Sequence, residues 1–148
     1  MSDAYEIVPG SRVFFGPAAT TWKPEVIAQF THIVNCDSAS DSTSPEGQSK
    51  HFLFLKSNDE ETYPILDTHL TPLCKYIERA LKDPDARVYI HCYMGMNRSA
   101  ALAVAYACEL TGYPAAGFIH ETRRQLRRLI LTNKGFEAQL NLRYPIPS

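Results

Sequence analysis

The residues from His91 to Ser99 combine a nucleophile, a cation and a glycine in one short segment, His-Cys-Tyr-Met-Gly-Met-Asn-Arg-Ser. An apolar run from Val88 to Ile90 precedes it, and an alanine-rich run from Ala100 to Cys108 follows it. We therefore predict a strand, a tight loop and a buried helix in that order. A loop that enters a helix turns its unpaired backbone N–H groups toward one point, where the positive end of the helix dipole also acts. Such a loop binds a phosphate group.

Cys92 and Arg98 are the residues of this loop that carry the chemistry. A helix N-terminus and a nearby cation stabilise the thiolate form of a cysteine, so we expect Cys92 to be a nucleophile that needs no separate base. The guanidinium of Arg98 offers paired N–H donors that match two phosphate oxygens. We expect Gly95 to permit a backbone conformation closed to other residues, and Ser99 to stabilise the sulfur as a leaving group. The alternative, that Cys92 is only a small buried packing residue, leaves the other three residues unexplained.

The segment resembles the signature His-Cys-x5-Arg-Ser/Thr of the cysteine-dependent protein phosphatases, and the chain looks most like their small dual-specificity members. Thr31–Asn35 is similar to the family's second strand, Lys56–Asp59 to its acid loop and Asn133–Leu140 to its last helix. The resemblance runs from about Arg12 to Tyr144. It implies an α/β fold, protein tyrosine phosphatase-like, with a central, mainly parallel, twisted sheet flanked by helices. It also implies a phosphate-binding loop supported by His91 and formed by Tyr93, Met94, Gly95, Met96, Asn97 and Arg98.

A proton donor must accompany the nucleophile, because the substrate oxygen otherwise leaves as a poor anion. The carboxylic acids that follow the third predicted strand are Asp59, Glu60, Glu61 and Asp67. From the residues alone, Asp59 serves equally well as a cap for a turn or for the next helix. The resemblance selects Asp59 as the general acid, with Glu60 and Glu61 as the remaining alternatives.

The substrate class follows from the variable positions of the loop, which are Tyr93, Met94, Met96 and Asn97 and include no lysine or arginine. Family members that act on inositol lipids or RNA 5′-triphosphates are expected to carry extra basic residues there. We therefore predict a protein phosphatase that acts on phosphotyrosine and on phosphoserine or phosphothreonine. The alternatives are an RNA 5′-phosphatase or another non-protein phosphatase of the same superfamily, and a phosphopeptide-binding module.

A second basic region lies in Arg-Arg-Gln-Leu-Arg-Arg, residues 123–128, on a predicted helix. A solvated helix face is the common explanation of such a cluster. Similar phosphatases have an arginine here that contacts a second phosphate or acidic substrate groups, and Arg123 or Arg127 could take this role. We interpret Asn133 as the cap of the last helix, and Trp22 as a packing residue.

Composition is that of an ordinary globular domain, with 148 residues, 45% hydrophobic and 21% charged residues and a net charge of −1. We expect a single domain over residues 1–148, with no membrane span, no general binding to nucleic acid, and no metal or other cofactor. Its macromolecular partner is then a phosphorylated protein. Composition does not determine the oligomeric state, and a monomer is our expectation.

Four cysteines without metal-type spacing, one of them a reactive thiol, indicate a reducing compartment, which is the cytoplasm or the nucleus. The opening residues also lack the features of a signal peptide. We expect Cys36 at the end of a strand beside the Cys92 strand. There it is either a packing residue, which we favour, or a thiol that traps oxidised Cys92 as a disulfide.

The chain alternates between strand and helix patterns, as an α/β domain should. A polar stretch without periodicity, residues 37–50, is interpreted as a flexible surface loop. The predicted strands are 12–15, 32–36, 51–55 and 87–90, and the predicted helices are 20–30, 63–81, 99–111, 114–128 and 134–143.

Overall fold

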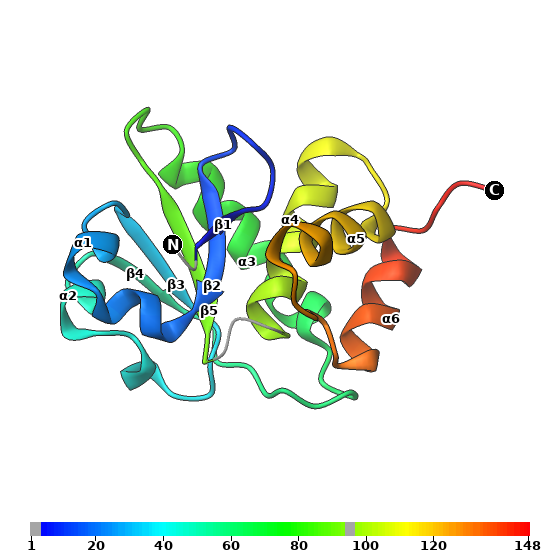
Figure 1. Ribbon diagram of the computed structural model, residues 1–148, viewed down its shortest axis with the longest axis horizontal. Coiled ribbons are helices and arrows are strands. Elements are labelled where there is room, and N and C mark those ends of the chain that lie inside the picture. The colour runs from blue at the N-terminus through cyan, green and yellow to red at the C-terminus, as the bar shows by residue number, and fades with distance from the viewer. Residues whose placement is uncertain (1–3, 94–96) are drawn as a thin grey trace.

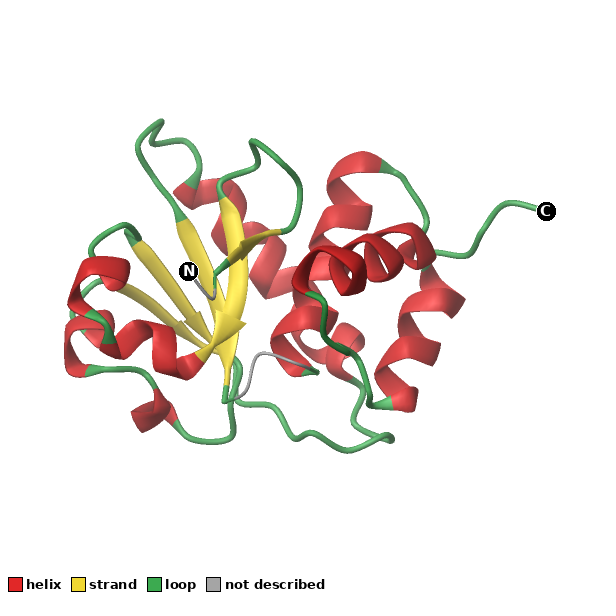
Figure 2. Cartoon of the chain, in the orientation of Figure 1, coloured by secondary structure: helices red, strands yellow, loops and turns green. Residues whose placement is uncertain are grey.

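A computed structural model of the chain describes residues 4–93 and 97–148, and places a five-stranded sheet between two groups of helices (Figures 1 and 2). The strand order is β1-β2-β5-β3-β4, so β5 is central. β1 pairs antiparallel with β2, and the other pairs are parallel. The predicted fold class is therefore confirmed. The strands are β1 Tyr5–Glu6, β2 Val13–Pro17, β3 His32–Asn35, β4 His51–Phe54 and β5 Val88–Cys92.

Helices cover both faces of the sheet (Figure 1). One face has the short helices η1 Ala18–Trp22, α1 Pro24–Ile27 and α2 Pro45–Gln48, with η2 Ser40–Ser42 in the connection from β3 to α2. The other face has α3 Ile65–Ala80, α4 Arg98–Thr111, α5 Ala115–Leu126 and α6 Lys134–Arg143. Because successive side chains of a strand point to opposite faces, β5 contributes to two cores. Val88 and Ile90 enter the larger core, whereas Tyr89 enters a smaller one with Ile27 and Phe30.

Helix α4 forms the centre of the larger core. Every residue from Ser99 to Cys108 is buried, as expected of a helix that is apolar on all sides. It ends at Thr111 and is capped by Gly112, whose φ of 78° is the left-handed conformation that glycine adopts without strain. The packing of α4 fixes the position of its N-terminus directly after β5, where the predicted phosphate-binding loop lies. Among the described residues, no helix has the length and apolar character needed to cross a membrane.

The helix predicted over residues 20–30 is wrong, because the chain there forms two shorter pieces. η1 ends at Trp22, and α1 begins at Pro24. Lys23 between them is extended, with φ −102° and ψ 108°. A proline disfavours the helical conformation in the residue before it, so Pro24 starts a new helix and also ends the previous one.

The prediction of a flexible loop over residues 37–50 is also wrong. Thr43 and Ser44 are buried there, and the segment contains η2 and α2. The Ser44 side chain accepts a hydrogen bond from Gly47 N and donates one to the Thr21 carbonyl, so it caps α2 and ties it to η1. Polar composition here reflects buried caps, which a pattern of hydrophobic residues does not reveal.

One strand and two helix boundaries also differ from the prediction. The two-residue strand β1 was not predicted. Helix α3 begins at Ile65, because Pro64 has ψ 69° and lies outside the helix. Helix α5 ends at Leu126, because Arg127 adopts a left-handed conformation with φ 51°. This turn removes Arg128 from the helix.

Candidate active site

Cys92 lies at the carboxyl end of the central strand, where its register partner on β2 is Pro17. The side chain is buried, with 2% of the residue exposed, and its Sγ lies 3.5 Å from Ser99 Oγ in the first turn of α4. A hydroxyl at this distance can donate to a thiolate and stabilise it. Met94, Gly95 and Met96, which we assigned to the phosphate-binding loop, lie outside the described residues.

Arg98, the first residue of α4, is held from one side. Its Nη1 lies 3.0 Å from Asp37 Oδ1 and donates to the Ser57 carbonyl at 3.1 Å. Its Nε is buried and has no hydrogen-bond partner among the described residues. A buried donor without a partner is costly, and a bound oxyanion would satisfy it. The guanidinium is therefore anchored through Nη1 with Nε available for a phosphate oxygen.

Asp37 is the residue that sequence reasoning missed. It lies two residues after the end of β3, and β3 neighbours β5 in parallel, so its side chain reaches the edge of the sheet at which Cys92 lies. Its carboxylate also accepts from Ser38 N at 2.7 Å, which fixes its orientation. An acidic residue directly after a buried strand was the signal in the sequence. We had included it in the loop interpreted as flexible.

His91 supports the loop from the side of the smaller core. Its Nδ1 lies 3.1 Å from the Cys92 carbonyl, and its Nε2 lies 2.7 Å from Thr43 Oγ1. Because a carbonyl only accepts, Nδ1 carries the proton and Nε2 accepts from the threonine hydroxyl. Burial lowers the pKa of His91 to about 4, so the ring is neutral at pH 7. The structure thus places His91 behind the nucleophile, as a bracing residue.

Asp59 is held by two amide side chains. Its Oδ2 accepts from Asn97 Nδ2 at 2.9 Å, and its Oδ1 accepts from Asn133 Nδ2 at 2.8 Å. Asn97 comes directly before Arg98, so the carboxylate lies at the mouth of the phosphate-binding loop. Asn133 also caps α6 through its side-chain oxygen, which accepts from Phe136 N. The predicted cap is confirmed, and the same residue makes a second contact to the acid.

The loop that carries Asp59 packs closely on α6. A Cβ atom on Gly135 would lie 1.8 Å from the Glu61 carbonyl oxygen, so only glycine permits this approach. Of the other carboxylates considered, Asp67 is exposed and pairs with Arg143 at 3.2 Å, in a different contact. The backbone of the acid loop is therefore fixed against α6, with Asp59 directed toward Asn97.

The arginine cluster divides into residues with different surroundings. Arg123 donates to the Ile130 carbonyl through Nε and Nη2 and pairs with Glu137 at 3.3 Å, so its guanidinium fixes the connection to α6. This placement does not support the substrate contact considered for Arg123. Arg127 is exposed on its turn.

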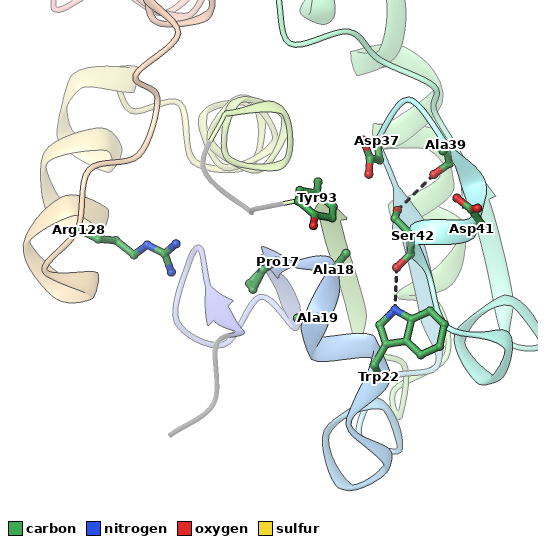
Figure 3. Close-up of a pocket in the computed structure, with 10 residues that line it drawn as sticks. All are labelled: Pro17, Ala18, Ala19, Trp22, Asp37, Ala39, Asp41, Ser42, Tyr93 and Arg128. Carbon is green, nitrogen blue, oxygen red and sulfur yellow. Dashed lines mark hydrogen bonds between the residues drawn. The ribbon is translucent and has the colours of Figure 1, made fainter.

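Arg128 contributes instead to a pocket of about 770 Å³ beside the catalytic loop. Tyr93, which follows Cys92, and Asp37, which pairs with Arg98, also line this pocket, so it adjoins the catalytic residues. Figure 3 shows Arg128 at one end, with Trp22, Asp41 and Ser42 together at the other. The interpretation of Trp22 as a packing residue is wrong, because 56% of it is exposed and it borders this pocket.

A buried thiol at the end of a parallel strand, an anchored arginine and a carboxylate across the loop define a site of the cysteine-dependent phosphatase class. The chain belongs to the dual-specificity phosphatase family, since the sequence model of the dual specificity phosphatase catalytic domain matches residues 13–144.

Individual relatives agree with this assignment. Dual specificity protein phosphatase 26 of Bos taurus is 29% identical over 114 residues, which cover 74% of this chain and 52% of that protein. Human dual specificity protein phosphatase 13B is 29% identical over 117 residues, which cover 76% of this chain and 58% of that protein. The chain thus spans little more than half the length of these curated relatives.

Two solved human structures share the fold. The crystal structure of DUSP28 has a TM-score of 0.80 at 22% identity, and the match covers 96% of this chain and 93% of that one. The tyrosine phosphatase-like serine/threonine/tyrosine-interacting protein has a TM-score of 0.80 at 23% identity, covering 97% and 96%. These likenesses concern the arrangement of the backbone.

Proposed function

We propose that this chain is a protein phosphatase that hydrolyses phosphotyrosine and phosphoserine or phosphothreonine through a cysteinyl-phosphate intermediate. The observation that carries the proposal is the state of Arg98, which is anchored through Nη1 and has a buried Nε without a hydrogen-bond partner among the described residues. An arginine fixed in this way is ready to bind an oxyanion without a change of position.

In the first step, Cys92 Sγ attacks phosphorus, so that an S–P bond forms and the bond from phosphorus to the substrate oxygen breaks. Asp59 in its acid form gives its proton to the leaving oxygen. Arg98 neutralises charge on the oxygens of the phosphoryl group in transit. This step releases the dephosphorylated side chain and leaves the phosphoryl group on sulfur.

In the second step, the carboxylate of Asp59 takes a proton from water, and the resulting hydroxide attacks phosphorus. The P–O bond to water forms as the S–P bond breaks, and Cys92 leaves as a thiolate. The Ser99 hydroxyl, 3.5 Å from the sulfur, stabilises this thiolate. Inorganic phosphate is released, and Asp59 is again protonated for the next cycle.

The substrate class is supported by the rim of the site. Tyr93 is 62% exposed beside the nucleophile, and neither Tyr93 nor Asn97 adds positive charge for a substrate with several phosphates. The described residues of the loop therefore suit a single phosphorylated side chain, and Arg128 is the one cation among the described residues that line the adjoining pocket. All four cysteines are free thiols, which supports our proposal of a reducing compartment, the cytoplasm or the nucleus.

The test is a substrate panel with purified protein, containing an aryl phosphate, three phosphopeptides, a 5′-triphosphorylated RNA and a phosphoinositide. We expect turnover of the aryl phosphate and the phosphopeptides, unchanged by a chelator. Cys92→Ser should abolish this turnover, whereas Cys108→Ser, a matched change at a buried thiol in the middle of the core, should retain it. Hydrolysis confined to the RNA or the lipid would contradict the protein substrate. Phosphopeptide binding without turnover of any compound would indicate a binding module.

A further inference from the structure

The pocket beside the catalytic loop has an end that the proposed chemistry does not use. It is formed by Trp22 and Asp41, and the small residues Pro17, Ala18 and Ala19 lie between this end and Arg128 (Figure 3). Because Asp37 both lines the pocket and holds Arg98, the pocket adjoins the site at which a phosphorylated residue would bind. The pocket is therefore placed to bind a side chain that flanks the phosphorylated residue.

Trp22 is oriented by a hydrogen bond even though it lies at the surface. Its indole Nε1 donates to the Ser42 carbonyl at 3.0 Å, while 56% of the residue remains exposed. A large aromatic ring held in one orientation without being buried is well suited to contact a ligand. The π face of tryptophan binds a cation more strongly than that of the other aromatic residues.

Asp41 gives this end of the pocket a negative charge. It is exposed, and its carboxylate makes no hydrogen bond or ion pair within the described residues. The carboxylate of Asp37, in contrast, is occupied by Arg98 and by Ser38 N. Asp41 is thus the acidic group of the pocket that is open to a partner, and it lies at the end opposite Arg128.

We infer that this end of the pocket binds a basic side chain of the phosphorylated protein substrate, with arginine preferred over lysine. The apolar stem of the side chain lies along Pro17 and Ala18, and its cation lies between the indole of Trp22 and the carboxylate of Asp41. Arginine is preferred because its planar guanidinium stacks on aromatic rings and binds carboxylates in a bidentate manner. This inference rests on the proposed function, and it narrows the substrates to phosphopeptides with a flanking basic residue.

The experiment measures kcat/KM for phosphopeptides of identical sequence in which one flanking residue is arginine, alanine or glutamate. The arginine is moved through the positions on either side of the phosphorylated residue. At one position we expect arginine to exceed alanine by about 5–30-fold, from a cation–π contact and a partly exposed ion pair. Trp22→Ala should bring this ratio of kcat/KM for the arginine and alanine peptides close to one, and Asp41→Asn should lower it by about 2–5-fold.

Two controls and a charge reversal complete the test. Tyr113→Ala and Asp85→Asn change an exposed aromatic residue and an exposed carboxylate away from the pocket, and should leave the ratio unchanged. Asp41→Lys should reverse the preference toward glutamate.

Equal hydrolysis of the arginine and alanine peptides at every position would overturn the inference. A preference of the wild-type protein for the glutamate peptide would overturn it as well, and would indicate that Arg128 binds an acidic side chain of the substrate. Hydrolysis of the aryl phosphate without that of any phosphopeptide would instead refute the protein substrate, and with it the inference.

Discussion

Replacing Asp37 by asparagine is expected to loosen Arg98 without removing the fold. In the native chain Asp37 Oδ1 lies 3.0 Å from Arg98 Nη1, with side-chain exposures of 9% and 12%. Asparagine fills nearly the same space but has no charge. The change therefore removes the electrostatic attraction that holds the guanidinium and leaves the packing around it almost intact.

The magnitude follows from the burial of the pair, because solvent screens so buried an interaction little. A hydrogen bond to a charged group contributes about 1.5–3 kcal/mol to the free energy of unfolding. For a domain near this size, a loss of that order lowers the melting temperature by about 3–12 °C, at about 2–4 °C per kcal/mol. We also expect kcat/KM for an aryl phosphate to fall by about 10–100-fold, because a catalytic group displaced by about 1 Å costs on the order of 100-fold.

The assay compares wild type, Asp37→Asn and the control Asp85→Asn by thermal melting and by kcat/KM. Asp85 is an exposed aspartate, so its replacement should change neither quantity. Added inorganic phosphate should raise the melting temperature of Asp37→Asn more than that of wild type, because the anion replaces the negative charge that Asp37 supplies to Arg98. An Asp37→Asn protein with wild-type kcat/KM and the melting temperature of the control would refute the reasoning.

Three further predictions concern the acid, the histidine and the second thiol. Asp59→Asn should lower kcat by about 10²–10⁴-fold in steady-state assays, with the smallest decrease for substrates whose leaving groups are already stable anions. A larger decrease of kcat in Glu61→Gln than in Asp59→Asn would show that the general acid is misassigned. Because the folded pKa of His91 is about 4 and the unfolded value is about 6.5, the unfolded chain binds the extra proton as pH falls through this window. The contribution of His91 to the free energy of unfolding should therefore fall by about 2 kcal/mol from pH 7 to pH 5. Urea unfolding of wild type and His91→Asn at both pH values measures this contribution. An equal change in the free energy of unfolding of the two proteins would contradict the prediction. Burial raises the pKa of Cys36 well above its usual value, and Cys36 Sγ donates to the His91 carbonyl. Mild peroxide should therefore oxidise Cys92 to the sulfinic acid and leave Cys36 as a free thiol. A disulfide between Cys36 and Cys92, found by peptide mapping, would disprove this.

The sequence was sufficient for the parts of the fold that local patterns determine. The last helix was predicted with its observed bounds, Lys134–Arg143, because Asn133 is a recognisable cap. The position of Cys36 after a strand beside β5 was also expected and is confirmed by the parallel pairing of β3 with β5. Each of these depends on neighbours in the chain or on the general rules of parallel sheets.

What could not be predicted depends on contacts between distant segments. Asp37 and Arg98 meet only because two strands carry them to one edge of the sheet, and no spacing in the sequence encodes that pair. Arg128 reaches the pocket only because Arg127 adopts a left-handed conformation, which is rare for a residue with a side chain. Thr43 is polar and was placed in a flexible loop, yet it is buried against His91.

The two amides on Asp59 have a consequence for the timing of catalysis. Because Asn97 and Asn133 hold both carboxylate oxygens, contacts within the folded chain are sufficient to position Asp59. The entropy of ordering this loop is lost when the chain folds and not in each catalytic cycle. For the proposed phosphatase, we therefore expect turnover to be limited by bond making and breaking or by departure of the product, and not by the ordering of this loop.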